Sequence, residues 1–215
     1  MKNYVSEFIG TGLLLAIVTG SGMMGESLAS GNNAVALLGN SIATGAGLYV
    51  LITLLGPISG AHFNPVVSAM FWKLGQISKK ELLGYWLVQF FGAIAGVWLT
   101  HLMFGSPILQ ESIKVRTGLG IWASEFISTL ILLSVIHLGV KVAKDKVPML
   151  VALTVTAGYW FTSSTFFSNP SVAVARGFTN TFVGISPKDI GPFLMAEIAA
   201  VVFFMLMFCS PKKIE

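Results

Sequence analysis

Long apolar runs alternate along the chain with short breaks made of glycine, proline, asparagine or charged residues. A helix needs about 20 apolar residues to cross the hydrocarbon core of a bilayer. Six runs have about that length, at positions of about 4–24, 35–57, 82–104, 119–140, 147–167 and 190–209. The pattern predicts an all-α membrane protein with six transmembrane helices, and we expect the first to be retained rather than cleaved as a signal peptide.

Two shorter apolar segments begin at an Asn-Pro pair directly after a long apolar run. Asparagine is a preferred N-cap residue, and proline is tolerated best at the first position of a helix. A helix that starts at Asn64 has only about ten apolar residues before Lys73, roughly half of a membrane span. A second helix of this kind starts at Asn169. The sequence therefore predicts two half-helices that begin near the middle of the membrane.

The chain contains an internal repeat. Residues 6–15 and 124–133 are identical at seven of ten positions, and each repeat contains one Asn-Pro pair. We expect a single channel domain over 1–215, with repeat halves at about 1–105 and 118–209. Since each half has three spans, the halves enter the membrane from opposite sides, which gives an inverted 3+3 repeat with the half-helices meeting at mid-membrane.

Composition and charge agree with a membrane protein. Hydrophobic residues make up 54% of the chain, charged residues 10%, and the mean hydropathy is +0.81, which excludes an ordinary soluble domain. The formal charge of +4 arises from basic residues beside apolar runs, so it predicts topology and no nucleic-acid partner. On one side of the membrane the predicted topology places nine basic residues: Lys2, Lys73, Lys79, Lys80, Lys141, Lys144, Lys146, Lys212 and Lys213. On the other side it places four: Lys114, Arg116, Arg176 and Lys188. This bias predicts cytoplasmic termini and a multi-pass protein of the cell (plasma or inner) membrane.

The half-helices would direct two positive dipole ends at one small region, which repels cations. The irregular segments before them are tolerated at this depth only where they are packed in protein or line a water-filled cavity. We expect the pore centre to consist of Asn64, Asn169, Pro65, Pro170, Val66 and Ser171. We expect pore-lining carbonyls from Gly60, Ala61, His62, Phe166, Phe167 and Ser168.

These residues carry a family resemblance over the whole chain. Glu7–Thr11, Ser59–Val66 and Asn169–Ser171 resemble the signature motifs of the aquaporin and aquaglyceroporin family, with Val66 and Ser171 in place of the usual alanine after Asn-Pro. The resemblance implies the aquaporin-like fold described above. It also implies membrane lipids and small neutral solutes as partners, and a homotetramer with one pore per subunit.

The family's outer constriction usually contains an aromatic residue and an arginine. An ungapped count places its four positions at Thr44, Ala157, Phe166 and Val172, so both of those residues are missing. The filter should be wider and less polar than that of a water-selective channel. Together with Ala175-Arg176 and Thr179–Phe182, it resembles the branch associated with arsenical and other metalloid solutes.

Several buried polar residues have two interpretations. Arg176 either lines a possible cationic mouth one turn beyond Val172, or extends to the interface or binds a loop carbonyl. Glu7 and Glu125 are either functional acids or, as we expect, structural buried acids that anchor the Asn-Pro loops. Glu197 is similar to them, and Gln89 is its rough counterpart in the first half. His62 either gates the pore or, as expected, packs against its wall.

Two further histidines, His101 and His137, are expected at the membrane interfaces. The chain shows no hydrolase or metalloprotease motif, and its aspartates lie in loops, so we expect no enzyme, no cofactor and no metal site. The function that follows is a passive channel for water, glycerol and neutral arsenic or other metalloid hydroxides. The alternatives are a water-selective aquaporin, a non-conducting scaffold of the same fold, or a secondary transporter, for which no coupling-ion site is evident.

Overall fold

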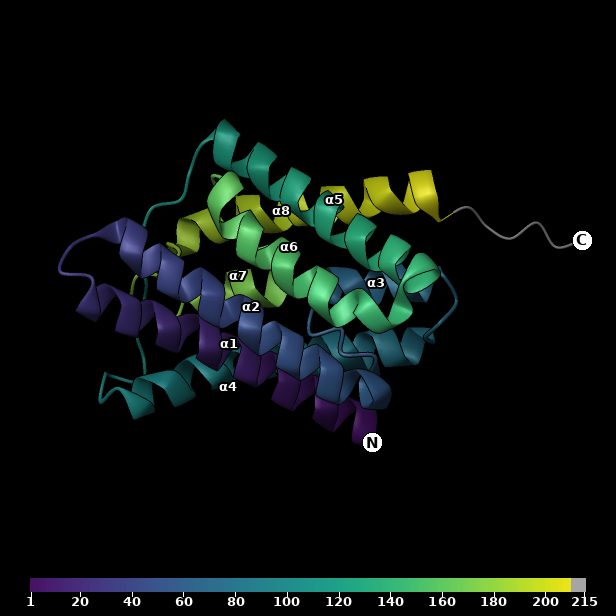
Figure 1. The fold of residues 1–215 in the computed structure, drawn as a ribbon, viewed down its shortest axis with the longest axis horizontal. Helices are drawn as coiled ribbons and strands as arrows, with labels where there is room; N and C mark the ends of the chain where they lie inside the picture. The colour runs from purple at the N-terminus through teal and green to yellow at the C-terminus, as the bar shows by residue number, and fades with distance from the viewer. Residues whose placement is uncertain (210–215) are drawn as a thin grey trace, which may run out of the picture.

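The computed structural model describes residues 1–209, and in this part of the chain all regular secondary structure is helical. The elements run side by side along one direction of the molecule (Figure 1). They are α1 (Lys2–Leu28), α2 (Asn33–Ser59), α3 (Pro65–Lys73), α4 (Lys79–Met103), α5 (Leu119–Val142), the 3-10 turn η1 (Lys144–Lys146), α6 (Val147–Phe161), α7 (Pro170–Arg176) and α8 (Pro187–Phe208). The all-α prediction is confirmed.

Five of these helices, α1, α2, α4, α5 and α8, are long and apolar enough to cross a membrane. The sixth predicted span is shorter than expected, because α6 ends at Phe161 rather than near 167. Residues 162–169 are irregular, and the φ angles of Thr165 and Phe166 are +61° and +55°, which no right-handed helix can contain. The end of that apolar run therefore belongs to the loop before α7.

The same order of elements occurs twice. In each half of the chain two helices precede a short helix, and a long helix follows it: α1, α2, α3, α4 and then α5, α6, α7, α8. The two short helices start at Pro65 and Pro170, where the Asn-Pro pairs predicted them. This order agrees with an internal duplication, which stays a prediction from the sequence.

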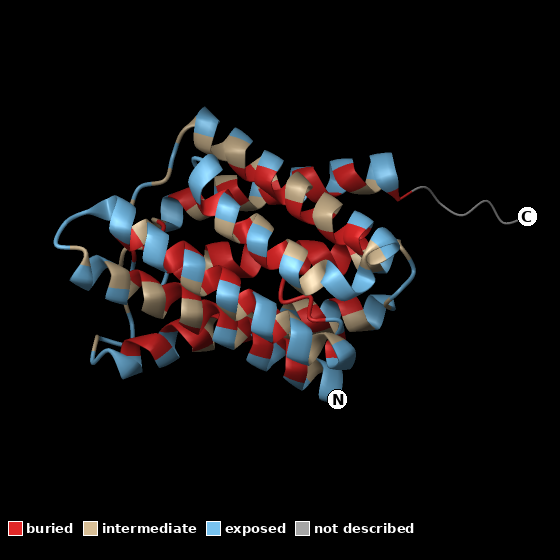
Figure 2. Ribbon diagram, viewed as in Figure 1, coloured by how far each residue is buried: buried red, intermediate tan, exposed pale blue. Residues whose placement is uncertain are grey.

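Small residues bring α1 and α4 into backbone contact. A Cβ atom added at Gly96 would overlap the carbonyl oxygen of Gly12, and one added at Gly92 would overlap that of Phe8. The outward faces of the helices are exposed and the inward faces buried (Figure 2). Exposed apolar side chains such as Leu153 and Leu206 lie on these outward faces, as expected for helices that face lipid.

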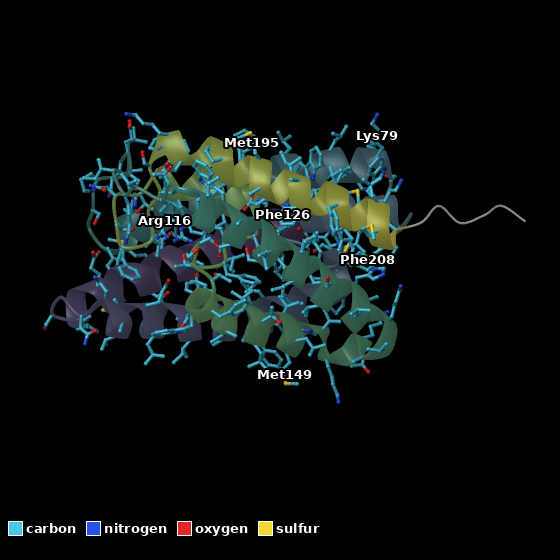
Figure 3. All side chains as sticks on the ribbon, turned by 90° about the horizontal axis from the view of Figure 1, so that it is seen from above. Lys79, Arg116, Phe126, Met149, Met195 and Phe208 are labelled. Carbon is cyan, nitrogen blue, oxygen red and sulfur yellow. The ribbon has the colours of Figure 1, made fainter. Side chains whose placement is uncertain are left out.

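Basic side chains are separated between the two ends of the bundle. Lys79 and Arg116 lie at opposite ends in the view of Figure 3. Arg176, which the topology count assigned to a loop, is instead buried at the end of α7. Lys212 and Lys213, which also entered that count, lie outside the described residues. The cytoplasmic position of the termini therefore stays a prediction.

Candidate functional site

The two short helices begin with the N-caps that the sequence predicted. The Asn64 side-chain oxygen accepts a hydrogen bond from the amide of Val66 at 3.0 Å. The Asn169 oxygen accepts one from the amide of Ser171 at 3.1 Å and one from its hydroxyl at 2.7 Å. Each cap satisfies an amide that the first turn of a helix cannot pair by itself.

The other ends of these side chains connect the two halves of the chain. Asn64 Nδ2 donates to the carbonyl oxygen of Ser168 at 2.7 Å, and Asn169 Nδ2 donates to that of Phe63 at 2.8 Å. A side-chain amide carries two protons, and each of these bonds uses one. Each loop is therefore held by the cap residue of the other half.

The backbone before each asparagine has an unusual conformation. Positive φ angles occur at equivalent distances before Asn64 and Asn169: Gly60 (88°), Ala61 (50°), Phe63 (48°), Thr165 (61°), Phe166 (55°) and Ser168 (47°). Such angles cost non-glycine residues roughly 1–2 kcal/mol each. They persist only where the surroundings determine the conformation, which indicates two deliberately shaped loops.

A buried acid of α1 fixes the first loop. Glu7 Oε1 accepts from the amide of His62 at 2.9 Å and the hydroxyl of Ser59 at 2.7 Å. Glu7 Oε2 accepts from the amide of Phe63 at 2.7 Å and from Gln89 Nε2 at 2.8 Å. These four donors compensate a carboxylate that has no exposed surface.

Two buried acids fix the second loop. Glu125 of α5 accepts a hydrogen bond from the amide of Ser168, and Glu197 of α8 accepts one from the amide of Asn169 at 2.7 Å. These contacts hold the backbone of both loops, which is the role that the anchoring interpretation gives to Glu7 and Glu125. The sequence analysis did not predict that Glu197 and Glu125 bind amides of the same loop.

A cavity of about 140 Å³ passes between the two loops. Both cap asparagines line it, together with ten aliphatic side chains of α1, α2, α5 and α6. A second cavity, of about 770 Å³, opens at the end of the molecule where α1 begins. The two cavities share the lining residues Ile52, Gly60, His62, Phe71, Val140 and Val147. The two cavities therefore lie next to each other, with His62 in the wall of both.

The predicted pore residues divide into two groups. Gly60, Ala61, His62, Phe166 and Phe167 line the first cavity together with the asparagines. The others are buried without lining it: Pro65, Val66, Ser168, Pro170 and Ser171. They shape the starts of α3 and α7, whereas the cavity surface comes from the residues before each asparagine.

Three of the four predicted filter residues, Thr44, Phe166 and Val172, line the cavity, and the fourth does not. Ala157 is exposed on the outward face of α6. Two residues later on the same helix, Tyr159 faces inward, and its hydroxyl lies 3.2 Å from Thr44 Oγ1. The position counted as Ala157 is therefore corrected, because an ungapped count does not determine which face of a helix a residue occupies.

Arg176 both lies beside the cavity and binds a loop carbonyl. Its Nε donates to the carbonyl of Val183, which ties down the following loop, and its guanidinium carbon lies 3.5 Å from the centre of the Phe167 ring. It also lines the cavity while being only 2% exposed. It is the one Lys, Arg, Asp or Glu side chain among the residues that line this cavity.

Arg116, from the loop before α5, was not predicted to approach the site. Its Nε donates to the carbonyl of Gly184 at 2.8 Å, and its guanidinium carbon lies 5.1 Å from the centre of the Phe167 ring. Burial lowers the pKa of Arg116 to about 10, so it remains charged near neutral pH. Burial, and then the charges of Arg116 and Arg176, lower the pKa of Lys114 to about 8.

The histidines contribute to packing. The His62 ring stacks on Phe71 with centroids 4.6 Å apart, and its Nδ1 lies 3.1 Å from the hydroxyl of Ser68. His101 and His137, which we expected at the membrane interfaces, lie near the ends of α4 and α5 and are buried in the bundle. His101 is fully buried between the carbonyl of Ile108 and the hydroxyl of Thr179, and His137 packs edge-on against Phe204. Neither is exposed, because each has partners inside the bundle.

Comparisons with known proteins agree with this geometry. The chain is 50% identical over 201 residues to aquaglyceroporin AqpS of Rhizobium meliloti (strain 1021), covering 94% of this chain and 86% of the relative. It is 28% identical to the probable aquaporin TIP1-2 of Oryza sativa subsp. japonica, covering 94% and 85%. The X-ray structure of the aquaglyceroporin from Plasmodium falciparum has the same fold, with a TM-score of 0.71 at 22% identity over 97% of this chain and 95% of that one. The model of the major intrinsic protein family matches residues 1–203, and the chain belongs to this family of membrane channels.

Proposed function

We propose that this protein is a passive channel for small uncharged solutes, with water, glycerol and neutral arsenic or other metalloid hydroxides as permeants. The observation that carries the proposal is a cavity lined by two cap amides and a largely aliphatic wall. A few fixed polar groups on an apolar wall suit solutes that have both hydroxyl and apolar surfaces. The relative named aquaglyceroporin, at 50% identity, supports the same solute class.

We further propose that the outer constriction consists of Thr44, Tyr159, Phe166 and Val172, without an arginine. Thr44 and Val172 are small, and the Tyr159 hydroxyl lies within hydrogen-bonding distance of Thr44. The width of the cavity at this constriction then depends on the short side chains of Thr44 and Val172. A wide and weakly polar constriction favours solutes larger than water, which is the reason for including metalloid hydroxides.

Arg176 forms the cationic mouth in this proposal. A guanidinium beside the cavity opposes the entry of cations, while its bond to the carbonyl of Val183 holds it in place. We propose a homotetramer in the cell membrane with cytoplasmic termini and one pore per subunit. The position of the cavity inside a single chain supports the last point.

Solute flux into proteoliposomes, followed by stopped-flow light scattering, tests the proposal. Water, glycerol and arsenite should all enter faster than in protein-free vesicles. In the double variant Thr44→Phe/Val172→Arg, the added side chains narrow the cavity, so glycerol and arsenite flux should fall much more than water flux.

Ala157→Phe is the matched control, because it adds the same ring on the outward face of α6 and should leave all three fluxes unchanged. Water flux without glycerol or arsenite flux in the unmodified protein would support a water-selective aquaporin instead. If the assembled protein conducts none of the three solutes, the result would support a non-conducting scaffold.

A further inference from the structure

Two acids on the second loop lie together in the interior, and the channel function makes no use of their chemistry. Glu125 and Glu197 accept hydrogen bonds from the successive amides of Ser168 and Asn169. Both side chains have no exposed surface, and they approach the same loop at adjacent backbone amides. The second oxygen of each, Oε2, is buried without a hydrogen-bond partner.

The first half of the chain shows what this arrangement lacks. There Glu7 Oε2 receives a hydrogen bond from Gln89 Nε2 on α4. In the second half Glu197 on α8 takes the place of that glutamine. An ionised carboxyl group is only an acceptor, whereas a glutamine amide is also a donor. Two ionised carboxylates here would leave two acceptors facing each other without a proton, in a place with little screening.

We propose that Glu125 and Glu197 form a binding site for one proton, in which protonated Glu197 donates from Oε2 to Oε2 of ionised Glu125. One proton satisfies both unpartnered oxygens at once. It also reproduces the bond that Gln89 makes in the first half. Glu197 Oε1 remains the acceptor for Asn169, so the proton secures the start of α7 and, through it, the pore centre.

The neighbouring charges decide which acid is ionised. The guanidinium groups of Arg116, from the outer loop, and Arg176, from α7, both lie over the ring of Phe167, one residue before Ser168, whose amide binds Glu125. Glu197 binds the next amide along the loop, that of Asn169, one residue further from Phe167. The other charged or titratable side chains of the packed helices lie further along them: Lys73 ends α3, Lys188 and Asp189 lie about two turns before Glu197 on α8, and His137 and Lys141 lie at least three turns beyond Glu125 on α5. Since positive charge stabilises the nearer carboxylate, the proposal places the proton on Glu197.

Glu197→Gln tests the proposal, because the amide has the shape of the protonated acid and donates in the same direction. Assembly, thermal stability and water flux of this variant should match those of the wild type at neutral pH. As the pH is raised, wild-type stability should fall when the shared proton is lost, and the variant should keep its stability. Failure of Glu197→Gln to assemble at neutral pH, with Glu197→Asp assembling, would overturn the proposal.

Gln89→Glu is the reciprocal variant, since it creates the same acid pair in the first half. It should assemble at neutral pH and become more sensitive to alkaline conditions than the wild type. Equal alkaline sensitivity of Gln89→Glu and the wild type would contradict a proton shared between paired acids.

Infrared spectroscopy of the purified protein gives a readout that does not depend on flux. The carbonyl stretch of a protonated carboxyl group should be present in the wild type at neutral pH and lost in Glu197→Gln. Its absence from the wild type would overturn the proposal. A loss of wild-type stability when sodium is replaced by a large organic cation, at constant pH, would also overturn it, because a metal ion would then bind between the carboxylates.

Discussion

Lys114 carries a charge near the outer loop that depends on its neighbours. Its Nζ donates to the carbonyl of Phe182 at 2.5 Å, and burial and the nearby guanidinium groups lower its pKa from 10.5 to about 8. Reaction with an amine-specific reagent, followed residue by residue by mass spectrometry, should rise with a midpoint near pH 8. Arg116→Gln removes a neighbouring charge, so it should move this midpoint to higher pH. An unchanged midpoint would mean that Arg116 does not act on Lys114.

The lowered pKa of Lys114 also determines how this residue changes the stability of the fold with pH. The unfolded chain holds the Lys114 proton up to about pH 10.5, and the folded chain only up to about pH 8. The unfolded state therefore binds more protons between these values, and this residue's contribution to stability increases as the pH rises through that window. Since Lys114 is only half-buried, solvent screening reduces the size of the effect.

At the residue scale, sequence reasoning located the pore residues better than it located their side-chain directions. Thr44 and Val172 both line the cavity, and Val172 lies three residues after Asn169, so the Asn-Pro pair determines its register. The placement of Ala157 was wrong because α6 is apolar on both its lipid and its pore face, so no polar pattern marks the inward side. Arg116 was missed because its position depends on how a long loop folds back onto the site.

At the scale of helices, the contact between α1 and α4 is set by glycine. Gly96→Ala should destabilise the protein by about 1–3 kcal/mol, because the added methyl group would overlap the backbone of Gly12 and force the helices apart. Gly39→Ala is the matched control, since a Cβ atom there has open space within α2. The midpoint of thermal unfolding in detergent should fall for the first variant and not for the second. Equal midpoints would show that the α1–α4 contact can relax without cost.

Most helices could be predicted because length and hydropathy are strong signals in a membrane protein. The starts of α3 and α7 were also predictable, since Asn-Pro combines a cap with the proline-tolerant first position. The end of α6 was not, because the residues after Phe161 keep an apolar composition while the backbone leaves the helix. The left-handed conformations there involve Thr165 and Phe166, which carry no glycine-like signal.

At the scale of the whole molecule, the single charge beside the central cavity should decide which ions are excluded. Arg176→Leu removes this charge, so sodium or potassium leak through assembled channels should increase. Arg176→Lys keeps the charge and loses the planar guanidinium that binds the Val183 carbonyl and stacks on Phe167. Ion leak into dye-loaded vesicles and the thermal stability of the same samples should separate the two roles.

The lysine variant should exclude cations and be less stable than the wild type. If the Arg176→Leu variant also excludes cations and is only less stable than the wild type, Arg176 is a structural anchor and the cationic-mouth proposal is wrong. Measurement per assembled channel is needed, because a fall in yield alone would resemble a change in permeability.

The reciprocal hydrogen bonds of the Asn64 and Asn169 side chains have a consequence for how the cavity can change its width. Because each half-helix is held by a carbonyl group of the opposite repeat, neither can move outward without breaking the bond made by the other. The width of the cavity between the two half-helices is therefore fixed by these bonds. Any regulation of its width would then act away from this junction, at the levels where Tyr159 and His62 line the cavity.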